Sequence, residues 1–484
     1  MTVIFRQHFL RSIQVFLSHY LNFVVDCIFF ASDVSALKDF ETAREIVDFL
    51  QSIKSDYLGD VILRPLPHAP VSSARLSATR LVDATKQNVL VRSHYHNHIL
   101  GVDFDVEAMP LTQQDTRTGA CAQASIWMAG RHFYNRHSAL WFSMPDITNA
   151  ALNPTSSGLT RSLPAGSEFL TPDNMVRALR AMGRHPVTYV PDRFSSSGVS
   201  WVNVSPKEVI SRYIDSGIPV ILGLQQSQTA IGHAVVAVGS ERKETMDVTV
   251  LPRSPTTSEF YSHFLVNDDQ RGAYCRLPIA DVDKTGEYPF SLESDIRFIL
   301  VPLPGKVFMT AESAELVARD IVESVTNNRI KYARQVLGED TDWDEDTEFY
   351  NTVLSDSLVA RTYLTYGWKY KERMLKNCCS QEMQAELLST QLPKYVWVTE
   401  FSMPDATAAS LEPCKRLIRA HVVSDATGSI FWDSQLIVDV PGMSVFRQYD
   451  PTAMNRDPKI VIRAFKEAAP YWPKIRGRMD YSVC

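Results

Sequence analysis

A cysteine at the start of a predicted helix is the first residue whose setting favours chemistry. Cys121 follows Gly119 and opens a run of small and apolar residues over 121–129. A helix N-terminus carries free N–H groups and the positive end of the helix dipole, which together stabilise a thiolate. Gln114, seven residues earlier, could donate a hydrogen bond to a developing oxyanion, with Gln113 as the alternative. Cys121 is therefore a candidate nucleophile.

A histidine and an acid at the ends of two apolar runs could serve that cysteine. His233 begins the run 233–239, where its ring can reach beyond a sheet edge and act as a general base. Asp268 ends the run 264–268 and could orient the far nitrogen of the imidazole. Its neighbours Asn267 and Asp269 leave that choice open. The expected set is Gln114, Cys121, His233 and Asp268.

The elements around these residues form a helical part followed by a sheet. Thr171 as N-cap, Pro172 at the first position and Gly183 as stop predict a helix over 171–182. Ser205 and Pro206 start a second helix over 205–216 in the same way. The apolar runs 219–222, 234–238, 264–266 and 297–301 predict strands. We therefore expect an α+β fold with a helical lobe and an antiparallel sheet.

Residues 111–301 resemble the papain-like cysteine peptidases, above all the bacterial branch related to bacteriocin-leader peptidases. The resemblance is carried by the order Gln, Cys, His, Asp, by Gly-x-Pro-Val at 217–220 and by His-Ala-Val-x-x-Val-Gly at 233–239. It implies a two-lobed domain in which Cys121 is the nucleophile, His233 the base, Asp268 its orienting partner and Gln114 the oxyanion donor. It implies no cofactor. In that family the Gln usually lies six residues before the Cys, whereas Gln114 lies seven before Cys121.

The function expected from this resemblance is hydrolysis of peptide or isopeptide bonds through a thioester acyl-enzyme, with a protein or peptide as substrate. The same residues serve deamidation and transamidation, and the sequence does not separate these reactions. A second hypothesis is a catalytically silent binding or assembly module. A third is a membrane-associated effector that docks through residues 1–31.

The regions on either side of this domain match no family that we recognise. Apolar spacing predicts helices over 1–31 and 37–53, the first amphipathic, with strands over 60–63, 89–92 and 98–101. The segment 302–305 marks a boundary, and the rest begins helical over 311–325 and continues with strands over 395–398, 419–423 and 435–440. The expected units are an N-terminal extension (1–105), a papain-like domain (106–304) and a C-terminal α+β accessory domain (305–484). The last is a possible site for a partner protein.

Three further clusters have an ordinary interpretation beside a functional one. His94, His96 and His98 alternate, so three imidazoles on one strand face could meet Zn²⁺, but a solvated polar strand without a nearby acidic ligand is favoured. The acidic run 339–348 is expected to be a solvated loop, with an interaction surface for a basic partner as the alternative. Cys378 and Cys379 are expected to pack in a helix.

Composition narrows the classes of partner. The 484 residues hold 49 Lys and Arg against 55 Asp and Glu, a net charge of −6, so nucleic acid is not an expected partner. A hydrophobic content of 45% fits a globular protein. Seven cysteines without paired spacing argue against a disulfide scaffold and for the cytoplasm. The richest apolar stretch, 21–31, is too short and too polar for a membrane span, so membrane contact is not expected.

Overall fold

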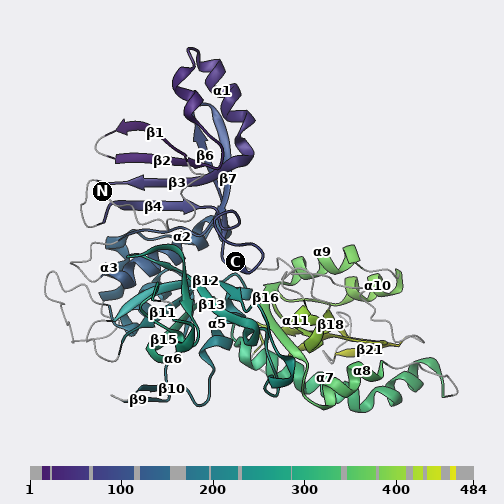
Figure 1. Cartoon of the computed structure of the whole chain (residues 1–484). Helices are drawn as coiled ribbons and strands as arrows, with labels where there is room; N and C mark the ends of the chain where they lie inside the picture. The colour runs from purple at the N-terminus through teal and green to yellow at the C-terminus, as the bar shows by residue number, and fades with distance from the viewer. Residues whose placement is uncertain are drawn as a thin grey trace.

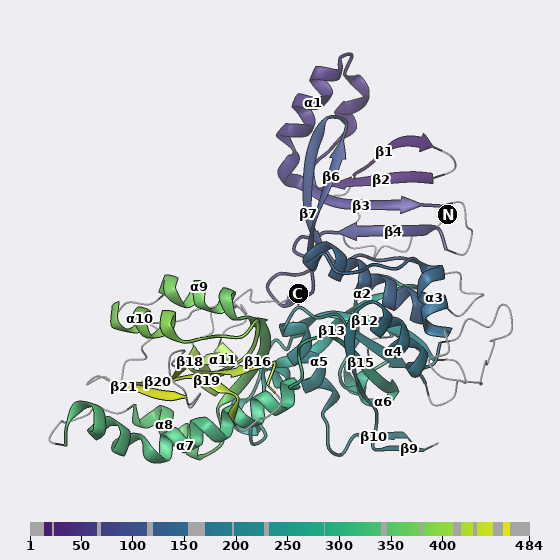
Figure 2. The same ribbon diagram turned by 180° about the vertical axis from the view of Figure 1, so that it is seen from behind.

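The computed structural model describes residues 14–21, 24–64, 69–113, 120–152, 170–195, 198–226, 232–284, 286–339, 346–377, 381–409, 418–428, 433–448 and 458–464. Within them helices and antiparallel sheets alternate, so the α+β class predicted from the sequence is confirmed. Figure 1 and Figure 2 show an N-terminal sheet, a central body and a C-terminal sheet with helices on both of its sides. No described helix is long and apolar enough to cross a membrane.

The N-terminal part is a four-stranded antiparallel sheet in the order β1-β2-β3-β4, formed by β1 (Gln14–Leu21), β2 (Val24–Phe30), β3 (Tyr57–Leu63) and β4 (Val71–Leu76). The helix predicted over residues 1–31 is therefore wrong for its described part. β2 reads VVDCIFF, a run of β-branched and aromatic residues that favours a strand. It pairs with β1 on one side and β3 on the other, and this pairing outweighs the helical spacing of the apolar residues on which the prediction is based.

The helix predicted over 37–53 is shorter than expected. It is divided into the 3-10 turn η1 (Ser35–Asp39) and the helix α1 (Ala43–Ser52). Thr42 is the N-cap of α1. Its side chain accepts a hydrogen bond from the N–H of Glu45, and the side chain of Glu45 accepts one from the N–H of Thr42. The 3-10 turn η2 (Lys54–Asp56) leads into β3, and the hairpin of β6 (Ser93–Ile99) and β7 (Val102–Ala108) comes later in the chain, after β4. The strand predicted over 98–101 is thus displaced, because Leu100 and Gly101 adopt positive φ and form the turn.

The central sheet has seven strands, all antiparallel. Its order is β14-β13-β12-β11-β15-β8, and β5 adds to β12. These strands are β5 (Gln87–Val89), β8 (Arg184–Tyr189), β11 (Val220–Leu224), β12 (His233–Arg242), β13 (Tyr261–Asp268), β14 (Gly272–Pro278) and β15 (Ile296–Pro304). Gly239 allows β5 to approach, since a Cβ there would lie 2.3 Å from the carbonyl oxygen of Asn88. The strands predicted over 219–222, 234–238, 264–266 and 297–301 are confirmed, whereas the strand predicted over 89–92 is displaced to 87–89.

Helices cover the sheet on both sides, which explains why its strands are nearly continuous apolar runs rather than alternating ones. α2 (Cys121–His137), α3 (Met144–Leu152) and α4 (Pro172–Ala181) pack together beside it, while α5 (Pro206–Asp215) lies toward the C-terminal part (Figure 1). The helices predicted over 171–182 and 205–216 are confirmed, and Thr171 caps α4 as expected. Shorter elements are β9 (Arg193–Ser195), β10 (Gly198–Ser200), η3 (Val248–Val250), η4 (Thr257–Phe260), η5 (Asp281–Asp283) and α6 (Leu292–Asp295).

The C-terminal part is a six-stranded antiparallel meander, β16-β17-β18-β19-β20-β21, with helices on both faces. One apolar core joins the sheet to α7 and α8, and a second joins its other face to α9 and α10. The strands are β16 (Val359–Tyr366), β17 (Tyr395–Ser402), β18 (Ile418–Asp425), β19 (Gln435–Val440), β20 (Met443–Gln448) and β21 (Lys459–Ala464). The helices are α7 (Ala311–Leu337), α8 (Thr347–Leu354), α9 (Gly367–Asn377), α10 (Gln381–Ser389) and α11 (Pro404–Ala409).

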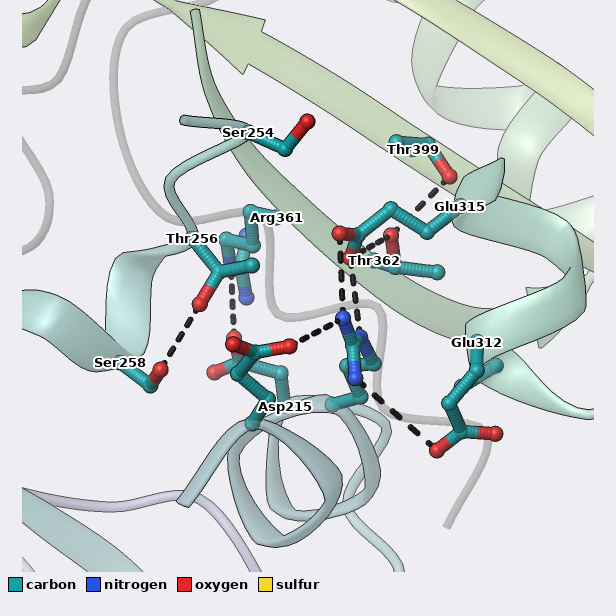
Figure 3. A network of polar contacts seen from close by, with 12 residues as sticks. Asp215, Ser254, Thr256, Ser258, Glu312, Glu315, Arg361, Thr362 and Thr399 are labelled. Carbon is teal, nitrogen blue, oxygen red and sulfur yellow. Dashed lines mark hydrogen bonds and ion pairs between the residues drawn. The ribbon is translucent and has the colours of Figure 1, made fainter. Parts of the chain in front are cut away.

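Buried ion pairs join the central and C-terminal parts. Arg361 of β16 places Nε 3.2 Å from Asp215 of α5 (Figure 3). A terminal nitrogen of the same guanidinium lies 3.2 Å from Glu400 of β17. Arg212 of α5 donates two hydrogen bonds, of 2.9 and 3.1 Å, to the carboxylate of Glu315 in α7. Because these charged groups are buried away from water, the removal of one partner would leave an unpaired charge inside the protein, which is strongly unfavourable.

Candidate active site

Cys121 is the first residue of α2 and is half-buried. The helix begins there after Ala120, whose side chain cannot cap it, so the N–H groups of the first turn are not taken by an N-cap side chain. The buried residues that follow, Ala122 to Ile126 among them, pack α2 against the sheet and contact β12. The sulfur is therefore held at the positive end of a 17-residue helix.

His233 is the first residue of β12, opposite Leu224 in the sheet register. Its ring is hydrogen bonded to the side chains of both Cys121 and Asp268. The Nε2 atom lies 3.0 Å from Oδ1 of Asp268. Because Nε2 is hydrogen bonded to the carboxylate of Asp268, Nδ1 is the ring nitrogen that remains for the sulfur of Cys121. The structure thus brings together three of the four residues that the sequence singled out.

Asp268 is fully buried and its two oxygens accept three hydrogen bonds. Oδ1 accepts from His233 and from the N–H of Gln270 at 2.8 Å, and Oδ2 accepts from the hydroxyl of Tyr288 at 2.7 Å. Burial opposes ionisation, but the hydrogen bond and charge of His233 with the bond from Tyr288 hold the pKa of Asp268 below its ordinary value. Asp268 is therefore a buried carboxylate anion fixed in position.

The carboxylate and the thiol hold the imidazole in its charged form. Burial lowers the pKa of His233, but the hydrogen bonds to Asp268 and Cys121 and the charge of Asp268 outweigh burial and raise it to about 10. The ring of Phe290 lies nearly parallel to the imidazole, with centroids 6.0 Å apart and planes at 19°. At neutral pH His233 is an imidazolium, the form that pairs with a thiolate.

Asp269 is a second buried acid beside the imidazole. Its Oδ1 lies 3.7 Å from Nε2 of His233, longer than a hydrogen bond. Burial raises the pKa of Asp269 to about 7, although the charge of His233 opposes that shift. Because Asp268 makes the shorter contact and carries the lowered pKa, it is the better partner for His233.

The side chain of Asn267 makes different contacts from that of Asp268, because successive residues of a strand point to opposite faces of the sheet. Its Nδ2 donates to the carbonyl oxygens of Met109 and Pro110, at 3.4 and 3.2 Å, and its Oδ1 accepts from the N–H of Tyr274 at 3.1 Å. Asn267 therefore anchors the segment that leads toward Cys121. Sequence reasoning named Asn267 only as a rival of Asp268 and missed this role.

Gln114 lies outside the described residues, as do residues 115–119, so its expected position is not placed. The alternative donor, Gln113, is engaged elsewhere: its Oε1 accepts a hydrogen bond from the N–H of Val71 at 3.1 Å, and its carbonyl oxygen accepts from the guanidinium of Arg64. Gln113 fastens the segment before Cys121 to the N-terminal sheet. That use makes Gln113 a poor oxyanion donor.

Tyr288 and Phe290 are site residues that sequence reasoning missed. Both lie in a loop around Pro289, and neither belongs to a periodic element or a motif, so the sequence carried no signal for them. Burial and the nearby charge of Asp268 raise the pKa of Tyr288 well above its ordinary value, so its hydroxyl keeps its proton and donates a hydrogen bond to Asp268.

A metal ion at this site would compete with the hydrogen bonds already made. Ligand atoms of His233, Asp268 and Asp269 lie within 4.8 Å of one another. However, Oδ1 of Asp268 accepts from His233 itself, and the pKa of His233, raised to about 10, keeps the imidazole protonated at neutral pH. The arrangement suits proton transfer and nucleophilic attack better than cation binding.

The remaining predicted clusters are only partly described. Among the described cysteines, Cys27, Cys121 and Cys275 are not joined in disulfides. Cys378 and Cys379 lie outside the described residues, as does most of the acidic run 339–348. Comparisons with models of protein families and with curated proteins find no match.

Proposed function

We propose that the chain is a cysteine peptidase that hydrolyses peptide or isopeptide bonds through Cys121, His233 and Asp268. One observation carries the proposal: the imidazole of His233 is hydrogen bonded at once to the thiol that begins α2 and to a buried carboxylate. A nucleophile, a base and an orienting group linked in this order are the usual machinery of acyl transfer.

The mechanism follows from these positions. The Cys121 thiolate attacks the carbonyl carbon, a C–S bond forms, and the carbonyl electron pair moves to oxygen. The N–H of Cys121 and the side chain of Gln114 are the proposed donors to that oxyanion. The C–N bond then breaks, and the imidazolium gives its proton to the leaving amine. His233 next takes a proton from water, which attacks the thioester. The C–S bond breaks, the acid leaves, and the Cys121 thiolate beside the His233 imidazolium is restored.

Further parts of the proposal rest on the same resemblance. A helix that begins with the nucleophile and packs on the sheet strand that begins with the base supports a papain-like arrangement for residues 106–304. The three described cysteines form no disulfide, in keeping with a reducing, cytoplasmic setting. A partner protein bound by residues 305–484 stays a prediction.

The testing experiment is alkylation with iodoacetamide at pH 6, followed by mass spectrometry of every cysteine. We expect Cys121 to react at least ten times faster than Cys275, the other half-buried described thiol, and the His233→Ala variant to lose that preference. Reaction of Cys121 no faster than Cys275, before and after limited proteolysis to open a closed cleft, would reject the proposal in favour of a binding module.

A second measurement separates the reactions that share this machinery. The unlabelled enzyme is first incubated with a peptide library, so that Cys121 can form the thioester. Products are then compared in water and with an added primary amine. Release of peptide acids supports hydrolysis, conversion of glutamine side chains to glutamate indicates a deamidase, and transfer to the amine indicates a transamidase. A Cys121→Ser variant is the control for each product.

A further inference from the structure

The outer face of the β6–β7 hairpin carries imidazoles on one strand and carboxylates on the other. Strand alternation exposes His94, His96 and His98 on β6 and Asp103, Asp105 and Glu107 on β7. The register sets each histidine opposite an acid: His94 opposite Glu107, His96 opposite Asp105, and His98 opposite Asp103. Sequence analysis expected no acidic ligand near these histidines, and the hairpin corrects that expectation.

Buried contacts on the inner face hold the outer face in place. Tyr95 and Phe104 belong to the apolar core of the N-terminal part. Asn97 donates hydrogen bonds to the hydroxyl of Tyr57 and, at 2.6 Å, to the carboxylate of Asp60. The strands therefore cannot turn over, and the neighbouring histidines must point outward together.

Three ligand atoms converge in the middle of this face. The side chains of His94, His96 and Asp105 each offer one ligand atom, and these atoms all lie within 4.8 Å of one another. Oδ1 of Asp105 contacts Nδ1 of His96 and lies 3.9 Å from Nε2 of His94. The two imidazoles are 4.6 Å apart between centroids and meet at 77°. Bonds of about 2.0–2.2 Å to one ion need ligand atoms about 3.3–3.6 Å apart, a small adjustment for exposed side chains.

We propose that His94, His96 and Asp105 bind a divalent transition-metal ion of the zinc type. Two imidazole nitrogens and one carboxylate oxygen are a donor set that Zn²⁺ takes in proteins, and three protein ligands leave a fourth position for water or a ligand from another molecule. The flanking acids are engaged: Nε of Arg92 lies 2.9 Å from Glu107, and Nδ1 of His98 lies 2.8 Å from Asp103. The proposal is independent of the peptidase activity.

The test uses the untagged full chain, because an added histidine tag would bind metal itself. Zn²⁺ is titrated against a chromophoric chelator at pH 7.5, for the wild type and for His94→Gln, His96→Gln and Asp105→Asn. His185→Gln is the matched control, because His185 is exposed and belongs to no described group of ligands. Each variant is first checked for an unchanged circular dichroism spectrum. The expected result is one equivalent of Zn²⁺ bound by wild type and control, with binding at least tenfold weaker in the three variants.

A parallel titration in the His233→Gln background separates this site from the candidate active site, which holds the other described group of ligand atoms. Loss of the Zn²⁺ equivalent with His233→Gln, but not with His94→Gln, would overturn the proposal, because the ion would then bind beside Cys121. Wild type that binds no Zn²⁺ below millimolar concentration would overturn it too, and the face would then hold surface ion pairs only.

Discussion

The imidazole of His233 and the carboxylate of Asp268 face each other across the ends of two adjacent strands, with 3.0 Å between Nε2 and Oδ1. They lie 35 residues apart in the chain, and the pairing of β12 with β13 brings them together. The hydroxyl of Tyr288 holds the other oxygen of Asp268. The imidazole is thereby fixed from the side opposite to Cys121.

Replacing Asp268 by Asn should slow the reaction of Cys121 while leaving the fold intact. The variant keeps the shape of the side chain but removes the charge that helps raise the pKa of His233. We expect kcat/KM on a peptide substrate to fall by about 10²-fold or more. Asp247→Asn, at an exposed loop acid, is the control and should leave the rate unchanged. Equal rates in both variants would contradict the orienting role of Asp268.

Replacing Asn267 by Ala should lower the stability of the fold and leave the pH profile of the reaction unchanged. The change leaves the carbonyl oxygens of Met109 and Pro110 and the N–H of Tyr274 without their buried partner. We expect the free energy of unfolding to fall by about 1–3 kcal/mol, measured by urea denaturation. The alkylation of Cys121 should keep its pH dependence, because Asn267 does not touch His233. A changed pH profile would instead place Asn267 in the proton pathway.

The charge on His233 should stabilise the fold at neutral pH and lose that effect in alkaline solution. Its pKa is raised from 6.5 to about 10 in the folded chain, so the folded form binds a proton that the unfolded form releases between these values. The contribution is fully present below pH 6.5 and disappears as pH rises through about 10. The difference in unfolding free energy between wild type and His233→Gln should shrink over this window, as urea denaturation at pH 6, 8 and 10 will reveal. A constant difference would mean that His233 is neutral throughout.

Asp269 should destabilise the fold once it ionises. Its pKa is raised from 3.8 to about 7 by burial, so stability is lost as pH rises from about 4 to about 7. Asp269→Asn removes the cost of the buried charge, and we expect the variant to gain stability relative to wild type at pH 8 but not at pH 3.5. Thermal unfolding at both values measures this. A gain of the same size at both would point to packing instead of ionisation.

Removing Arg361 should destabilise the interface between the central and C-terminal parts. Arg361→Leu leaves the carboxylates of Asp215 and Glu400 buried without a shared cation. The expected loss is about 3–5 kcal/mol in the free energy of unfolding. Arg44→Leu is the control, because Arg44 pairs with Asp48 at the exposed surface and should change stability little. If both variants unfold alike, the buried pairs do not hold the two parts together.

The sequence by itself determined the local elements whose signals are local. The cap at Thr171 with Pro172 predicted α4, and the continuous apolar run after His233 predicted the strand β12. Cys121 was recognised because a helix start is visible in sequence. These features depend on residues that are close neighbours in the sequence, so a short stretch of sequence is enough to predict them.

Only the tertiary structure decided what depends on distant partners. Residues 24–30 form a strand because β1 and β3 supply its hydrogen bonds, which no helical spacing could reveal. The choice of Asp268 over Asn267 follows from the register of β13 with β12, which sets Asn267 opposite Val236 and Asp268 on the same sheet face as His233. Tyr288 enters the site from a loop without any pattern. Burial and neighbouring charge set the pKa values of His233 and Asp269, and both are properties of the packed molecule rather than of the residues.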